Sequence, residues 1–204
     1  DVLREEVAKK KKEAEAARSL AAARRENANV KRAEADAKAA EAETRKTSAQ
    51  KSRDSFVETI LDTQTQFKAK ILIDAAIEGV VVTKVATSLN AGDQSAACDS
   101  IYSRMQIDSS SGFCDAKASS GSSIGRRLLA TSFEVDVILS PAAVDQKIIG
   151  AAVSSLTASG LDMSVTDEEP MDVLTSVPGL DQDALSSVET EATAAAAAKS
   201  DAEA

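Results

Sequence analysis

The chain has 204 residues, with 24 Lys and Arg against 33 Asp and Glu, a formal net charge of −9, and neither His nor Trp. The absence of His excludes the Ser/His and Cys/His pairs of nucleophilic catalysis and every metal site that needs an imidazole. With four Phe and one Tyr, any core is mainly aliphatic. This length accommodates one domain and an extension, and no stretch approaches the roughly 20 apolar residues of a transmembrane helix.

Residues 1–65 have the composition of one long charged helix. No Gly or Pro interrupts residues 1–78, where the strong helix formers Ala, Glu, Lys and Arg predominate. Counting in sevens gives an apolar residue at eight consecutive positions, the heptad column: Val7, Ala14, Ala21, Ala28, Ala35, Ala42, Ala49 and Phe56. A strict seven-residue repeat favours a left-handed supercoil or bundle. We therefore interpret the heptad column as a helix interface.

Charge is arranged on both sides of this helix. The positions three and four places after the heptad column, here called the basic columns, are mostly Lys or Arg: Lys10, Lys11, Ala17, Arg18, Arg24, Arg25, Lys31, Arg32, Lys38, Ala39, Arg45, Lys46, Ser52 and Arg53. A less regular apolar stripe on the other side, the opposite stripe, has acidic neighbours such as Glu34 and Glu41, and consists of Ala16, Leu20, Ala23, Val30, Ala33, Ala37 and Ala40. Two interpretations stay open: a solvated lone helix held by i,i+4 ion pairs, and packing against other protein chains.

Nucleic acid is not an expected partner of the helix. Residues 1–55 carry 15 Lys and Arg and 11 Asp and Glu, a net charge of +4. Phosphate binding depends on uncompensated positive charge, and this segment is too balanced for it. The rest of the chain is strongly acidic, which permits attraction between the helix of one copy and the body of another.

Residues 66–168 are expected to form an α+β domain. The expected strands are residues 67–73, 113–118, 128–139 and 161–165. The expected helices are residues 93–105, capped by Asp93, and a segment opened by Pro141 and closed by Gly160. Residues 75–89 are ambiguous, although β-branching favours an extended backbone over residues 80–85. The order predicts a split βαβ fold with both helices on one face of an antiparallel sheet. Residues 169–204 are expected as an acidic, partly low-complexity tail.

Cys98 and Cys114 are the only cysteines, with fifteen residues between them and no His to complete a zinc site. We predict a disulfide bond, which for a loop of this length contributes about 3 kcal/mol. Such a bond indicates an oxidising compartment. Two unrelated buried thiols are the alternative.

The run Gly125-Arg-Arg-Leu-Leu-Ala130, followed by Thr-Ser-Phe-Glu-Val-Asp-Val137, resembles modules of secreted and cell-surface proteins of algae, green algae and dinoflagellates especially. These modules are similar to SEA-like domains, which have a ferredoxin-like βαββαβ fold. The resemblance covers about residues 66–166 and implies an extracellular, cell-wall or flagellar-surface setting. Some SEA domains cleave themselves at a Gly-Ser before β-branched residues. Here Gly79-Val-Val-Val82 lacks the Ser, and Gly121-Ser-Ser-Ile124 lacks the valine run.

The remaining motifs predict no catalytic chemistry. The glycine-rich segment 121–127 lacks the Gly-Lys-Ser/Thr ending of a phosphate loop, so a hairpin tip is the preferred interpretation. Arg126 and Arg127 form a candidate processing site, with an exposed basic turn as the alternative. The acidic groups at residues 167–169 and at Asp181 and Asp183 lack calcium-loop spacing. The sequence therefore points to no catalytic residue, cofactor, metal or small-molecule substrate.

These observations together predict a non-enzymatic structural subunit of an extracellular or cell-surface assembly. Its helix is expected to bind copies of itself or other protein chains. One alternative is an accessory subunit of a membrane complex, such as a photosynthetic one, in an oxidising compartment such as the thylakoid lumen. A second alternative is a self-cleaving SEA-like domain or a small hydrolase.

Overall fold

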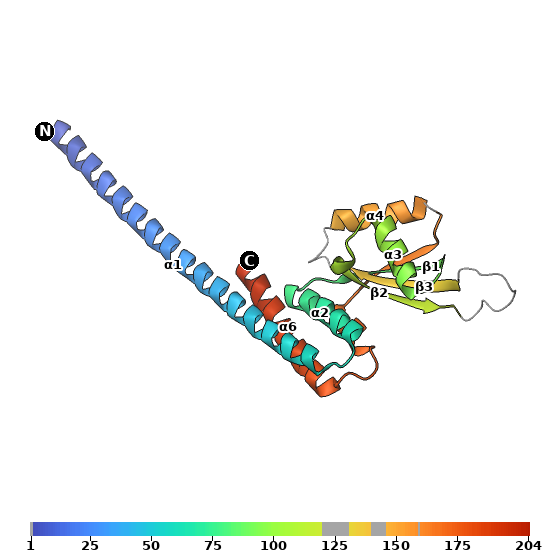
Figure 1. Ribbon diagram of the computed structural model, residues 1–204. Coiled ribbons are helices and arrows are strands. Elements are labelled where there is room, and N and C mark those ends of the chain that lie inside the picture. The colour runs from blue at the N-terminus through green and yellow to red at the C-terminus, as the bar shows by residue number, and fades with distance from the viewer. Residues whose placement is uncertain (1, 120–130, 140–145, 159) are drawn as a thin grey trace, which may run out of the picture. The chain divides into compact units, whose positions relative to one another are not determined.

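The computed structural model describes residues 2–119, 131–139, 146–158 and 160–204 (Figure 1). The chain divides into two compact units, one made of Asp1–Thr44 and Ala198–Ala204 and the other of Arg45–Ala197. Helix α1 (Val2–Thr59) is continuous and long, and the second unit contains a four-stranded antiparallel sheet. The predicted α+β class with a long N-terminal helix is therefore confirmed.

The described part of the first unit is helical from Val2 to Thr44 and from Ala198 to Glu203. It contains α1 up to Thr44 and the last residues of α6 (Gln182–Glu203). Within it, Lys38 Nζ donates a hydrogen bond to the Asp201 carbonyl oxygen at 3.2 Å, and the Thr44 hydroxyl donates to the Ala40 carbonyl at 2.9 Å. The absence of Gly and Pro from this part of α1 explains why the helix is uninterrupted.

The sheet of the second unit has four strands, β1 (Val82–Ala91), β2 (Gly112–Ala118), β3 (Thr131–Leu139) and β4 (Met163–Glu168). Their spatial order is β2-β3-β1-β4, and every neighbouring pair is antiparallel. Val85 lies at the centre, opposite Val137 on one side and Val165 on the other. Strand β2 is therefore at one edge of the sheet and β4 at the other.

Helices α3 (Gln94–Met105) and α4 (Gln146–Ala158) pack on one face of the sheet, as Figure 1 shows. Phe133, Val135 and Val137 of β3 are buried beneath these two helices, whereas Glu134, which lies between Phe133 and Val135 in the strand, is exposed. This alternation is the period-2 pattern that predicted the strand. Asp93 begins α3, since its side chain accepts a hydrogen bond from the Ala96 N–H at 2.8 Å. A 3₁₀ turn (Ser109–Ser111) leads into β2.

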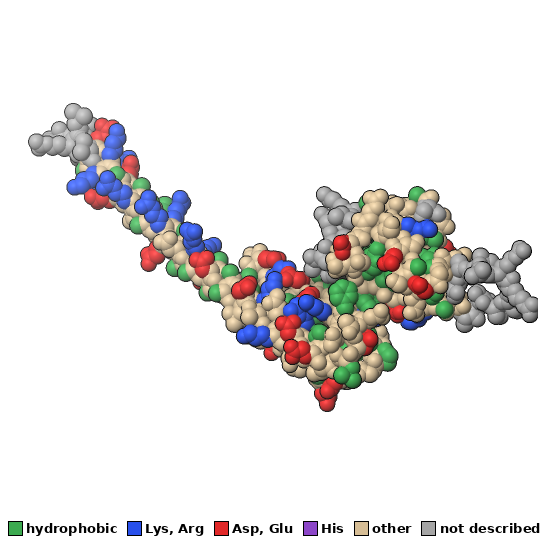
Figure 2. Space-filling model, viewed as in Figure 1, with side chains coloured by type: hydrophobic (Ala, Val, Ile, Leu, Met, Phe, Trp, Pro, Cys, Tyr) green, Lys and Arg blue, Asp and Glu red, His purple; other side chains and the backbone are tan. Residues whose placement is uncertain are grey.

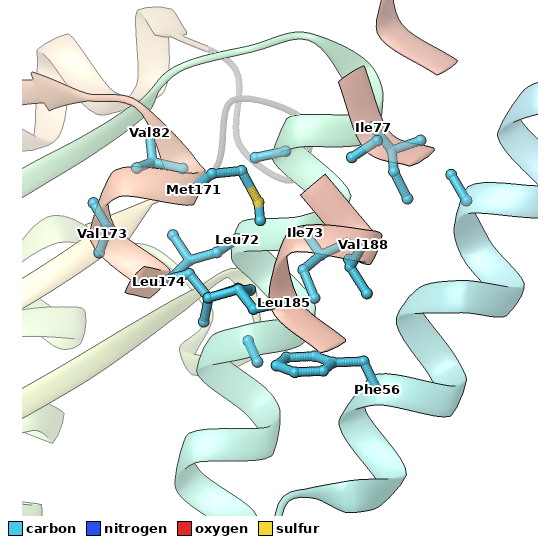
Figure 3. Packing of buried hydrophobic residues seen from close by; sticks show 14 of the residues in the cluster. Phe56, Leu72, Ile73, Ile77, Val82, Met171, Val173, Leu174, Leu185 and Val188 are labelled. Atoms are coloured by element: carbon cyan, nitrogen blue, oxygen red, sulfur yellow. The ribbon is translucent and has the colours of Figure 1, made fainter. Parts of the chain in front are cut away.

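A second buried cluster lies among the end of α1, α2 (Thr63–Glu78), α5 (Pro170–Thr175) and α6, and reaches the sheet at Val82 and Ile138. Figure 3 shows Phe56 extending from α1 toward α2 and α6, with Leu185 beside it. Leu72 and Leu174 in this cluster have no exposed surface. The unit therefore has one aliphatic core on the α3 and α4 side of the sheet and another built mainly between helices.

The expected strand at residues 67–73 is wrong, because these residues belong to helix α2. The Asp62 carboxylate accepts a hydrogen bond from the Thr65 N–H at 2.6 Å and so caps the helix. Buried Ala69, Leu72 and Ile73 are spaced for a helix, not a strand. The extended backbone expected over residues 80–85 is found from Val82 onward, so β1 is the first strand of the predicted order.

Gly79 ends α2 in the left-handed conformation, with φ 68°, and its N–H bonds to the Ala75 and Ala76 carbonyls. A Cβ atom there would lie 3.2 Å from the Ala196 Cβ atom of α6. Glycine therefore serves both the turn into β1 and the close approach of two helices.

Residues 169–204, which the sequence suggested as a tail, form α5 and α6 and contribute to the buried cluster. Leu185, Val188, Ala192 and Ala195 are each at most 3% exposed. Their three- and four-residue spacing is that of one helix face. Gly160, with φ 77° and its N–H bonded to the Thr157 carbonyl at 3.0 Å, follows α4 as predicted, whereas Pro141 lies outside the described residues.

Candidate interaction surface

The heptad column has two different environments. Ala14, Ala21, Ala28 and Ala35 are exposed, as is every residue from 8 to 41, and Ala42 is half-buried. Val7 lies within α1, but its side chain is outside the described part of the structure. Figure 2 shows the blue and red side chains of Lys, Arg, Asp and Glu along α1, with green apolar groups between them. The N-terminal part of the column is thus an apolar seam on a charged, solvent-facing helix.

The last two members of the column, in the second unit, are buried. Ala49 is 1% exposed and Phe56 is 3% exposed, and both belong to the cluster that includes Leu185, Val188 and Ala192 of α6. The Ser48 hydroxyl donates to the Glu191 carboxylate of α6 at 3.1 Å. Where the chain provides a neighbouring Ala-rich helix, the column therefore packs against it.

The basic columns also find partners in the second unit. Lys46 Nζ lies 2.6 Å from the Glu78 carboxylate, and the Arg53 guanidinium pairs with Asp74. Both acids belong to α2 and are four residues apart, so they lie on one face of that helix. Sequence reasoning missed these partners because it placed a strand in this region, although the Asp74 and Glu78 spacing was a helical signal.

The predicted disulfide is confirmed. Cys98 of α3 and Cys114 of β2 are joined with an Sγ–Sγ distance of 2.02 Å and Cα atoms 5.9 Å apart. Both side chains are half-buried. The bond fixes α3 to the edge strand of the sheet. Arg126, Arg127 and the Gly121-Ser122 sequence lie outside the described residues.

Tyr102, on the buried side of α3, is 7% exposed, and its hydroxyl has no hydrogen-bond partner among the described residues. Desolvation by burial disfavours the phenolate and raises the pKa of Tyr102 to about 12. The hydroxyl is therefore a protonated donor throughout the physiological range.

We expect the ionisation of Tyr102 to be observable without interference, because the chain has one Tyr and no Trp. Titration by ultraviolet phenolate absorbance should give a midpoint of about 12 in the folded protein and about 10 in urea. Since the unfolded chain loses this proton first, the tyrosine contribution to stability is complete below pH ~10 and declines as pH rises through the folded pKa. A folded midpoint equal to the urea value would contradict this environment.

The second unit has several open clefts, among them two that border α2. One, of about 480 Å³, lies between α1 and α2 and includes Lys46, Arg53, Asp74 and Glu78, which are already engaged in ion pairs. The other, of about 460 Å³, follows β2 and is bordered by α2 and α3. Among the described residues no group of three or more Cys, Asp or Glu side chains is arranged to hold a metal ion. None of the helices in the described ranges combines the length and apolarity that a bilayer crossing requires.

The described residues thus present an exposed apolar seam on α1, an edge strand that is fixed by a disulfide, and open clefts beside α2. No protein-family model matches the chain, and neither the curated proteins nor the solved structures contain a significant match to it.

Proposed function

We propose that this chain is a non-enzymatic assembly subunit that binds other protein chains, copies of itself included, through the N-terminal part of α1. The observation that carries the proposal is the contrast along one column. Ala49 and Phe56 are buried against helices of the same chain, whereas the same seven-residue repeat continues through the exposed Ala35, Ala28 and Ala21. A helix from another chain would cover the exposed positions as α6 covers the last two.

The charges select the kind of partner. Two heptad columns facing each other would bring Lys and Arg of both basic columns together, which is unfavourable. A partner helix with acidic flanks would instead repeat the pairing of Lys46 and Arg53 with Glu78 and Asp74. The opposite stripe of α1 has such flanks, and its Leu20 and Val30 are 53% and 51% exposed. We infer that copies associate with the heptad column of one against the opposite stripe of the next, which is a heterologous contact.

The second unit is proposed to be a ferredoxin-like, SEA-like module of an extracellular or cell-surface assembly. Support comes from the element order β1, α3, β2, β3, α4, β4 and the strand order β2-β3-β1-β4. The disulfide is compatible with an oxidising compartment. The resemblance of residues 125–137 to algal surface modules agrees with this setting.

The test is the effect of substitutions within the column on self-association. Ala21→Arg with Ala28→Arg introduces bulk and like charge while keeping strong helix formers. Sedimentation velocity at micromolar concentration should show wild-type assemblies that dissociate as salt rises, because the Debye length falls from about 30 Å at 0.01 M to about 3 Å at 1 M. The double variant should sediment as a monomer.

The matched control is Ser103→Arg with Ser155→Arg, which adds the same two charges at exposed positions of α3 and α4, away from both apolar faces of α1. This variant should form the same assemblies as wild type and should show the same response to salt. A wild-type protein that remains monomeric at micromolar concentration and low salt would refute self-association through α1.

A further inference from the structure

We propose that the outer edge of strand β2 binds an extended, uncharged peptide segment of a partner protein, which adds to the sheet as a fifth strand. β2 is the first strand in the order β2-β3-β1-β4, so no strand among the described residues pairs with its outer side. Free strand edges present backbone donors and acceptors to any chain that can reach them. This surface is separate from the heptad column.

The register identifies which backbone groups point outward. The Ser119 N–H bonds to the Ser132 carbonyl at 2.8 Å, and the β2 to β3 pairing continues without interruption from there. Hydrogen-bonded and non-hydrogen-bonded pairs alternate in an antiparallel ladder. The backbone groups of Asp115 and Lys117 therefore face β3, whereas those of Cys114 and Ala116 face away from it.

The edge lies along the floor of the 460 Å³ cleft, here called the β2 cleft. Five consecutive β2 residues, 112–116, line it, with the start of α2 on one side and α3 on the other. Five strand residues span roughly 17 Å, and the cleft volume is typical of ligand sites. Because α2 and α3 flank the cleft, one extended segment can enter between them. The edge of a second sheet that carries its own helices would collide with these two helices.

The lining indicates an uncharged occupant. Most of its polar groups are hydroxyls and amides, among them Thr63, Gln64, Gln94 and Ser95. Asp115 is the one ionisable carboxylate in this lining, and Lys117 Nζ pairs with it at 3.1 Å. A charged peptide side chain would therefore lose hydration without gaining an unpaired opposite charge.

The aromatic side chains in the lining further define the peptide. Phe67, which is 39% exposed, and the half-buried Phe113 offer an apolar contact for alternate side chains of a bound strand. The class of ligand is thus a strand-forming segment with apolar residues on one side and small polar residues on the other.

The first test needs no ligand. Amide hydrogen exchange of the full, disulfide-bonded chain should show Cys114 and Ala116 exchanging faster than their neighbours Asp115 and Lys117. Equal protection of all four amides would mean that the outer edge is already covered, and this would overturn the proposal.

The second test uses a displayed library of random ten-residue peptides, selected on the full chain. We expect uncharged, proline-poor sequences that slow exchange at Cys114 and Ala116. Ala116→Pro removes an outward N–H, and Ser95→Trp fills the cleft from α3. Each should weaken peptide binding at least tenfold, whereas the matched control Ser103→Trp, on exposed α3 surface outside the cleft, should leave it unchanged.

Several results would refute the proposal. One is a selection that yields no peptide above background. Another is a set of selected peptides that bind the Ser95→Trp variant as tightly as they bind wild type. Neutral oligosaccharides that bind wild type and Ala116→Pro equally but not Ser95→Trp would assign the cleft to another ligand class. Peptides should bind the Ala21→Arg, Ala28→Arg variant as they bind wild type. Loss of self-association through α1 can therefore be distinguished from loss of peptide binding in the β2 cleft.

Discussion

Replacement of both Cys98 and Cys114 by Ala is expected to lower the free energy of unfolding by about 3 kcal/mol, because the disulfide limits the conformations of the unfolded loop between them. The bond also fixes α3 to β2, an edge strand whose one partner among the described strands is β3. Urea denaturation followed by circular dichroism measures the change.

The control for this prediction is chemical reduction. A reductant should move the wild-type urea midpoint to that of the double variant and leave the variant unaffected. A wild-type midpoint that does not respond to the reductant would show that the cross-link contributes nothing to the folded state. The comparison also separates loss of the bond from loss of the two side chains.

Leu185→Ala is expected to destabilise the protein by about 2–5 kcal/mol, the usual cost of emptying a buried leucine site. Leu185 is 1% exposed and lies with Phe56, Leu72 and Leu174 in the helical cluster. Thermal or urea unfolding should show this loss for the whole second unit, since α6 shares a core with α2 and α5.

Leu61→Ala provides a control of identical chemistry. Leu61 is 99% exposed in the connection between α1 and α2, so its replacement should change stability by no more than about 0.5 kcal/mol. If both variants unfolded at the same midpoint, α6 would be a detached tail and not a part of the core.

The sequence predicted a strand both for residues 67–73 and for β3, and only the prediction for β3 is confirmed. The comparison shows what limits inference from the sequence. In β3, Phe133, Val135 and Val137 alternate with Ser132, Glu134 and Asp136, a pattern that fits a strand and no helix face. In residues 67–73, Phe67, Ala69, Ile71 and Ile73 alternate as they would in a strand. Ala69, Leu72 and Ile73 in the same segment also have the three- and four-residue spacing of a helix face. The Asp62 cap and packing against α5 decide in favour of the helix.

The sequence by itself determined the features that depend on local chemistry: the uninterrupted N-terminal helix, the Asp93 cap of α3, the β2 and β3 strands, and the Cys98 and Cys114 pair. These follow from helix propensity, capping groups, period-2 alternation and the absence of any other thiol. Each signal is contained within a short segment or a single residue type.

Only the tertiary structure decided which parts of a repeating pattern are buried. Ala28 and Ala49 occupy equivalent heptad positions with nearly the same local sequence character, yet Ala28 is exposed and Ala49 is 1% exposed. The difference arises because α6, more than a hundred residues further along the chain, packs on one and not on the other. Burial therefore depends on neighbours that are distant in the sequence. A local apolar repeat specifies a helix face that can pack, but it does not specify which element covers that face.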